Sequence, residues 1–172
     1  MKIINKPVLK LIIISLLFFL FSDCGSSKEI NELSSQINCQ KRIYFVWDDE
    51  SNYAKYSKNG NFNNLVKRKN LNIKDLFIST IKRLNKKHEG EYIYSEYIGF
   101  PSDSVIYVKV KLEKVNWNMG FSKTIADMQM SFSTNEKELK LIGRSNGYSG
   151  EKCYLKSFED ATLQFIIANC GN

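Results

Sequence analysis

The sequence predicts an α+β fold in which a mixed five-stranded sheet carries two helices on one face. Strand-like and helix-like segments follow one another in the order β-α-β-β-β-β-α. The later strands alternate apolar and polar residues, whereas two other segments carry apolar residues at helical spacing. Because alternating strands expose only one face to water, both helices are expected on the other face, and the Lys and Tyr side chains on the exposed one.

The first strand and the first helix are expected at residues 42–47 and 72–89. Residues 42–47 are β-branched and aromatic and are apolar on both faces, which is typical of a central strand. Asn72 is a helix N-cap with Asp75 three positions later, and Gly90 is the expected terminator. The apolar stripe of this helix consists of Ile73, Leu76, Phe77, Ile81 and Leu84.

The remaining elements are expected to form a strand at 92–98, a meander and a closing helix. The meander strands are residues 104–117, 124–133 and 138–148. In the first of these the alternation changes phase, which predicts a β-bulge near residues 113–115. Ser157 is the expected cap of the last helix.

The N-terminal segment has the pattern of a lipoprotein signal peptide. Lys2, Lys6 and Lys10 precede an apolar run, 11–21, that is too short to span a bilayer stably, and Cys24 follows it. We expect a signal peptide at 1–23, diacylation of Cys24, a flexible tether at 24–40 and one α/β domain at 41–172. The Phe-Ser-Asp-Cys box is atypical, so an ordinary cleaved signal and an uncleaved anchor stay open as alternatives.

A long polar segment, residues 48–72, is the expected contact loop. The chain has 25 basic and 18 acidic residues and a net charge of +7, which suits an anionic envelope component or an acidic protein. Nucleic acid is not expected as a partner of an exported chain. Cations interleaved with aromatics are typical of interfaces; those of the loop are Tyr53, Lys55, Tyr56, Lys58, Lys67, Arg68 and Lys69.

Three cysteines remain after Cys24, and an oxidising compartment favours one disulfide among them. If successive strands alternate in direction, Cys39 and Cys153 lie at the same end of the sheet. A Cys39–Cys153 disulfide is therefore expected, and Cys39–Cys170 is the alternative if the loops defeat that layout. No cysteine or histidine spacing indicates a metal, and no cofactor is expected.

Two groups of residues are candidates for a metal site or for catalysis. Asp48, Asp49 and Glu50, with Glu96, could gather at the ends of parallel strands and hold Ca²⁺, but a solvated acidic turn is preferred. His88 could act as a general base, but neighbouring cations would keep its pKa low. We therefore expect it to be a non-catalytic residue at the end of the helix.

A lipidated leader followed by this order of elements resembles several groups of small envelope lipoproteins. These are the YajG-like group, the lipopolysaccharide-assembly lipoproteins and the relatives of the curli-secretion lipoprotein, in which a long strand pair precedes a closing helix. The resemblance implies a non-catalytic role at the outer membrane, in assembly or in holding a partner protein. A surface protein that contacts host or matrix molecules, and an envelope hydrolase, remain as alternative functions.

Overall fold

The computed structural model describes residues 39–59, 72–88, 90–119, 124–147 and 150–170. The expected signal peptide, Cys24 and most of the expected tether lie outside these residues. The elements, in chain order, are β1 (Arg42–Trp47), the 3-10 helix η1 (Asp49–Tyr53), β2 (Lys55–Asn59), α3 (Ile73–Lys87), β3 (Tyr92–Ser95), β4 (Val105–Met119), β5 (Thr124–Ser133), β6 (Glu138–Gly147) and α4 (Gly150–Cys170).

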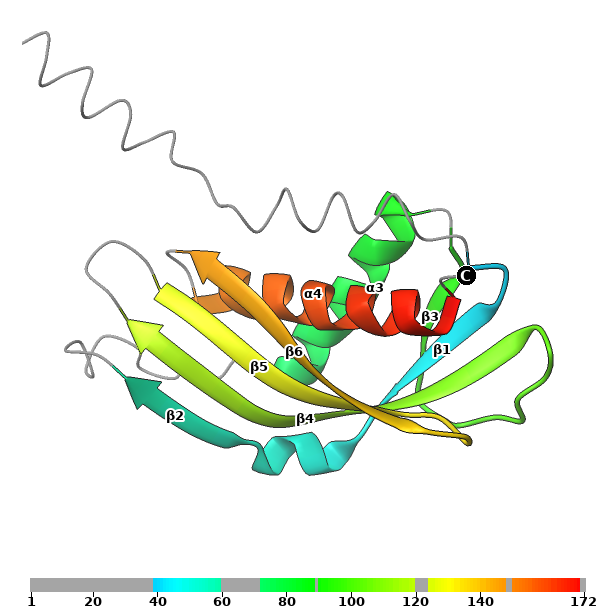
Figure 1. Cartoon of the computed structure of the whole chain (residues 1–172), viewed down its shortest axis with the longest axis horizontal. Helices are drawn as coiled ribbons and strands as arrows, with labels where there is room; N and C mark the ends of the chain where they lie inside the picture. The colour runs from blue at the N-terminus through cyan, green and yellow to red at the C-terminus, as the bar shows by residue number, and fades with distance from the viewer. Residues whose placement is uncertain (1–38, 60–71, 89, 120–123, 148–149, 171–172) are drawn as a thin grey trace, which may run out of the picture.

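The six strands form one mixed sheet, and both helices cover the same face of it (Figure 1). The order across the sheet is β3-β1-β4-β5-β6, and β2 also pairs with β4. Strands β1, β3 and β4 are parallel, whereas β5 is antiparallel to its neighbours β4 and β6. The predicted α+β class with two helices on one face is confirmed, with one strand more than expected.

The extra strand, β2, lies inside the segment expected to be loop. β1 and β2 run one after the other along the same side of β4, opposite residues 105–110 and 114–118. Between them, η1 faces the predicted bulge, where the register of β4 shifts between Leu112 and Lys114. The Ser51 hydroxyl accepts the Leu112 N–H at 2.9 Å, so the interrupted ladder leaves no unpaired donor there.

Aromatic rings from the sheet and from both helices form the centre of the core. Phe45 and Trp47 of β1 meet Phe77 of α3 at centroid distances of 6.2 and 5.1 Å. Phe158 and Phe165 of α4 contact the same cluster, and Phe165 stacks on Phe132 of β5 at 5.0 Å. The predicted stripe of α3 is buried at four of its five positions, and the Asn72 side chain accepts the Asp75 N–H as expected.

Helix α4 begins earlier than expected and lies directly on β6. It starts at Gly150, so Ser157 is an interior residue and not a cap. The buried Ser157 hydroxyl lies 3.0 Å from the Ala126 carbonyl oxygen and 2.9 Å from Ser145 Oγ. A Cβ on Gly143 would lie 1.9 Å from the Ser157 carbonyl oxygen, so only glycine permits this approach of helix to strand.

The expected hairpin between β3 and β4 is wrong, and the expected disulfide is wrong with it. Because β3 and β4 are both parallel to β1, the connection between them returns the chain to the starting end of the sheet. Every later element is therefore reversed relative to the expected layout. Helix α4 ends, rather than begins, beside Cys39. The bond formed is Cys39–Cys170, with a Cα–Cα distance of 4.8 Å, while Cys153 is buried and takes no part in a disulfide.

Candidate functional site

The face of the sheet without helices, the open face, carries a mixed polar surface. Its side chains alternate with the core positions of the strands, so Tyr107, Lys109 and Lys111 point outward from β4 while Val108 and Val110 are buried. Tyr44 of β1 stacks on Tyr107 with a centroid distance of 4.9 Å. The expectation that Lys and Tyr side chains occupy this face is confirmed.

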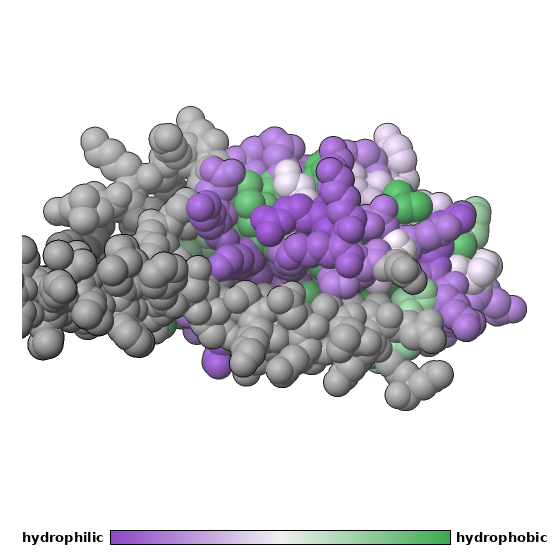
Figure 2. All heavy atoms as spheres, turned by 90° about the horizontal axis from the view of Figure 1, so that it is seen from above, coloured by the Kyte–Doolittle hydropathy of each residue, from purple (hydrophilic) through white to green (hydrophobic). Residues whose placement is uncertain are grey.

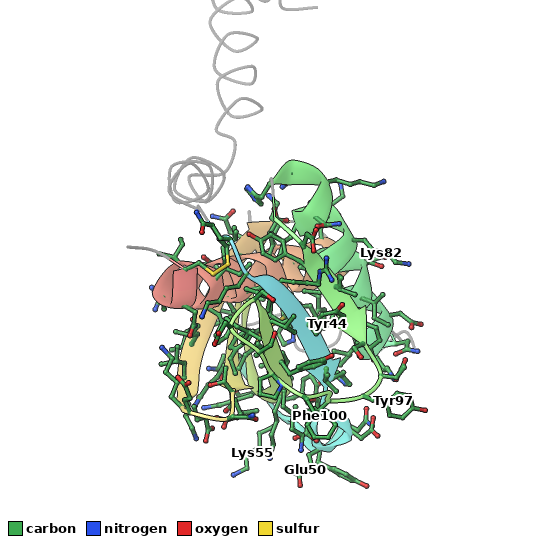
Figure 3. The ribbon with its side chains drawn as sticks, turned by 90° about the vertical axis from the view of Figure 1, so that its right-hand side faces the viewer. Tyr44, Glu50, Lys55, Lys82, Tyr97 and Phe100 are labelled. Carbon is green, nitrogen blue, oxygen red and sulfur yellow. A yellow bond between two sulfur atoms is a disulfide. The ribbon has the colours of Figure 1, made fainter. Side chains whose placement is uncertain are left out.

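The connection between β3 and β4 crosses this open face. A Cβ on Gly99 would lie 2.4 Å from the Tyr107 hydroxyl, so the loop backbone packs directly on that ring. On either side of Gly99 the loop projects Tyr97, which is 82% exposed, and Phe100, which is 97% exposed. In Figure 3 both lie lower in the view than Lys82 of α3.

The large apolar side chains that are exposed among the described residues come from one loop, from η1 and from β6. Tyr97, Ile98 and Phe100 come from the β3–β4 loop, Tyr53 from η1 and Ile142 from β6. Ile142 pairs in register with Gln129 and lies one position from the buried Gly143, which places it on the open face. Over the helices, by contrast, the described surface is mostly hydrophilic (Figure 2). We call Tyr53, Tyr97 and Phe100 the aromatic rim.

Most cations of the open face already have a carboxylate partner. Lys109 Nζ lies 3.0 Å from Asp48 Oδ2, and Lys111 pairs with Glu50. Further pairs join Lys140 to Glu113 at 3.1 Å and Arg144 to Asp127 at 3.3 Å. Because these four pairs neutralise one another, they add little net attraction for an anion.

Two carboxylates of this face are held ionised by their surroundings. For Glu113, the hydrogen bond from Ser131 lowers the pKa most, burial opposes it, and Lys140 lowers it further. For Asp48, burial alone would raise the pKa, but the Glu50 N–H and Lys109 outweigh it and leave the pKa lowered. Both groups therefore stabilise the cations beside them and are poorly suited to accept a proton from a substrate.

The residues of the predicted contact loop have separate positions. Tyr53 and Lys55 are exposed, as a contact requires. Tyr56 is half-buried and packs against the core, because its partner Val115 lies on the helix side of the sheet. Lys58 belongs to β2, and its side chain is outside the described part, as are Lys67, Arg68 and Lys69. Sequence reasoning missed the rim residues of the β3–β4 loop.

The acidic residues weighed for Ca²⁺ do not gather. Asp48, Glu50 and Glu96 each pair with a different lysine, the last with Lys74 at 2.8 Å. The described residues contain no group of three side chains that could hold a metal ion.

His88 follows the C-terminus of α3, as expected. Burial lowers its pKa most, the charge of Lys87 lowers it further, and Glu159 acts in the opposite direction. Its Nε2 has no hydrogen-bond partner in the described part of the chain. His88 and Cys39 line the same surface hollow, but Cys39 is in a disulfide and offers no thiolate.

The comparisons with known proteins add no functional information. No protein-family model matches the chain, and no curated protein matches it. Among solved structures, one titled "Crystal structure of uncharacterized protein" is 10% identical, covers 78% of this chain and 94% of that one, and has a TM-score of 0.29. A likeness this distant carries no argument. None of the described helices, including the 21-residue α4, has the length and apolar character needed to cross a membrane.

Proposed function

We propose that this chain is an envelope lipoprotein, anchored through Cys24, that binds a partner protein through the aromatic rim and does no catalysis. The observation that carries the proposal is the position of the exposed apolar side chains. Large aromatic side chains left in water favour burial by a partner, and Tyr and Phe are enriched where proteins meet. Here Tyr97 and Phe100 come from one loop, which packs on Tyr107 of the open face at Gly99, and Tyr53 comes from η1.

The ion pairs of the open face favour a protein over a polyanionic polymer as the partner. A surface for a polyanion presents cations without partners, whereas Lys109, Lys111, Lys140 and Arg144 have carboxylates beside them. A surface on which charged side chains form ion pairs beside aromatic side chains has the composition of a protein interface.

The extracytoplasmic location rests on two independent features. The leader has the pattern of an export signal, and the Cys39–Cys170 disulfide suits an oxidising compartment. Lipidation is tested by labelled palmitate, which is expected to enter the wild-type chain but not the Cys24→Ser variant. Equal labelling of both chains, or of neither, contradicts the anchor.

The contact is tested by placing a photo-crosslinking amino acid at Tyr97 in intact cells, with the same probe at Lys82 on α3 as the matched control. We expect a discrete protein adduct from Tyr97 and none from Lys82. The further change Phe100→Asp is expected to abolish the adduct without lowering the thermal midpoint, since Phe100 is almost wholly exposed. Adducts of equal yield from both probes, or an adduct unaffected by Phe100→Asp, would contradict the proposal.

A further inference from the structure

A hollow of about 620 Å³ lies on the open face, at the bulge that interrupts the ladder of β4. Its lining comes from η1 and the start of β2 on one side, and from residues 111–114 of β4 and Gln129 of β5 on the other. Tyr53 of the aromatic rim belongs to this lining. β-Bulges are common next to functional sites, where they redirect side chains, so this hollow is a candidate part of the contact surface.

The strand register places two lysines of the hollow in neighbouring positions. Lys55 of β2 is the register partner of Lys114 of β4. Both point to the open face, because the next residues along the strands, Tyr56 and Val115, pack against the core on the helix side. Adjacent strands lie about 4.8 Å apart, so the two side chains start side by side and line the same hollow. In Figure 3 Lys55 extends from the lower edge of the domain, as does Glu50.

The carboxylates of the lining are directed to other cations. Glu50 pairs with Lys111. Glu113 turns toward β5 and β6, where its carboxylate accepts a hydrogen bond from Gln129 Nε2 at 2.8 Å and lies 3.1 Å from Lys140 Nζ. Both carboxylates are therefore engaged away from β2, and neither is shared with the lysine pair.

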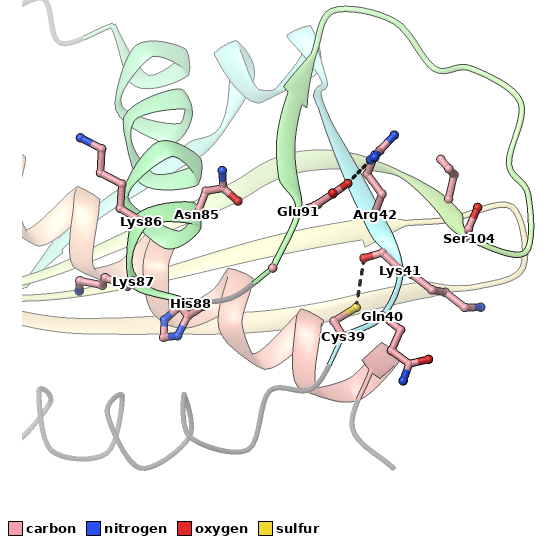
Figure 4. Close-up of a pocket in the computed structure, with 12 residues that line it drawn as sticks. Cys39, Gln40, Lys41, Arg42, Asn85, Lys86, Lys87, His88, Glu91 and Ser104 are labelled. Carbon is pink, nitrogen blue, oxygen red and sulfur yellow. Dashed lines mark hydrogen bonds and ion pairs between the residues drawn. The ribbon is translucent and has the colours of Figure 1, made fainter.

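Lys55 and Lys114 are two like charges side by side. Among the described residues neither has a carboxylate within ion-pair distance, and the chain on both sides of each lysine is described. Like charges this close repel one another, and an anion between them relieves the repulsion. The hollow at the start of β1 offers no such pair, because Lys41 and Lys86 lie on its opposite sides and point away from each other (Figure 4).

We propose that the hollow at the bulge binds a carboxylate side chain of the partner protein, with Lys55 and Lys114 as the recognising cations. This inference rests on the proposed contact through the aromatic rim and adds the chemistry of the partner, which is an Asp or Glu next to an apolar side chain that packs on Tyr53. A single pair of lysines, on a face whose neighbouring cations are already paired, matches one carboxylate better than a polyanion. Such charge complementarity fixes the register of an interface.

The first test is zero-length crosslinking with a water-soluble carbodiimide on membranes from cells that produce the full chain. The reagent activates a carboxylate, and a contacting amine then forms an amide while the reagent leaves as a urea. We expect amides between Lys55 or Lys114 and an Asp or Glu of another protein, identified by mass spectrometry. The link between Lys111 and Glu50 within the chain is the internal positive control, and Lys152, exposed on α4, is the residue expected to give no link.

Three outcomes of this crosslinking contradict the proposal. The first is the absence of an intermolecular link from both lysines of the hollow. The second is a link from Lys152 with the same yield, which indicates random collision. The third is a product in which Lys55 or Lys114 carries a lipid in place of a peptide, which overturns the assignment to a protein.

Two double variants with the same loss of charge separate recognition from general attraction. Lys55→Gln with Lys114→Gln is expected to lower the yield of the Tyr97 photo-adduct by up to about fivefold, the effect of an exposed ion pair. Lys82→Gln with Lys152→Gln, on the helices, is expected to leave the yield unchanged. Equal yields from the two double variants overturn the site.

The remaining readouts keep folding and the rim apart from the hollow. Replacing Lys55 and Lys114 removes a repulsion, so the thermal midpoint is not expected to fall, and a lower midpoint would contradict the proposed pair. If the Tyr97 probe gives no adduct but the carbodiimide links form, the hollow binds its carboxylate without the rim. If the Tyr97 adduct forms equally well in the double variant, the rim contact holds and the inference is wrong.

Discussion

Replacing Cys39 and Cys170 together by serine is expected to destabilise the domain more than any other pair of changes discussed. The disulfide joins residues 131 positions apart, so it constrains nearly the whole folded chain. The chain-entropy relation gives about 5 kcal/mol for a loop of this length, and typical losses are about 2–5 kcal/mol. Against a typical stability of about 5–15 kcal/mol for a domain, a loss of about 5 kcal/mol is a third or more of the total.

The assay is urea unfolding followed by tryptophan fluorescence. Trp47 and Trp117 are both buried, so their emission reports loss of the core. At a slope of about 2 kcal/mol per M, a loss of about 4 kcal/mol lowers the midpoint by about 2 M. The control is Cys153→Ala, which removes the remaining described cysteine and keeps the disulfide. An unchanged midpoint in the double variant, or peptide mapping that links Cys39 to Cys153, would refute the reasoning.

Three further predictions concern single residues. Gly143→Ala is expected to lower the free energy of unfolding by about 1–3 kcal/mol because α4 must move away from β6, while Gly147→Ala, whose Cβ would meet Cys153 Sγ at an ordinary 3.4 Å, costs less in the same denaturant titration. Glu159→Gln removes the charge that joins α3 to α4 and is expected to cost about 1–3 kcal/mol; a thermal midpoint equal to that of wild type would contradict this role. The folded-state pKa of Glu113 is lowered, so the unfolded chain takes up the proton first and the contribution of Glu113 to stability is lost as the pH falls through that pKa. Glu113→Gln is therefore expected to flatten the loss of stability as the pH falls below the ordinary glutamate pKa of 4.5, and parallel pH curves for the two proteins would rule out the effect.

Local patterns in the sequence were sufficient for elements whose own residues define them. The start of α3 follows from the Asn72 side chain and the apolar stripe, and the bulge in β4 follows from the change of alternation after Leu112. These features depend on neighbours a few residues away. For that reason they are visible without knowledge of which strands lie side by side.

The order of the strands could not be read in the same way. The sequence of residues 96–104 is consistent with a hairpin and with a crossover. The structure has the crossover, which places Cys170 at the opposite end of the sheet from the one that a hairpin predicts. β2 was missed because, among its described side chains, Tyr56 alone contacts the core. Serine is a common N-cap residue, but the Ser157 hydroxyl instead hydrogen-bonds to the Ala126 carbonyl oxygen of β5 and to the Ser145 hydroxyl of β6.

The loop residues of the aromatic rim were missed because Tyr97 continues the apolar pattern of β3. Residues 92–98 read as one strand, whereas pairing ends at Ser95. Gly99 and Pro101 were the available signal, since both interrupt strands. An apolar run that ends in such residues indicates side chains outside the sheet.

The outer edge of β6 is closed by side chains of α4. Asp160 accepts the Arg144 N–H at 2.7 Å, and Gln164 donates to the Ile142 carbonyl at 3.1 Å. A bare strand edge offers unpaired backbone groups to the edge of a neighbouring copy. By occupying these two backbone groups, α4 leaves less of the β6 edge available for such pairing.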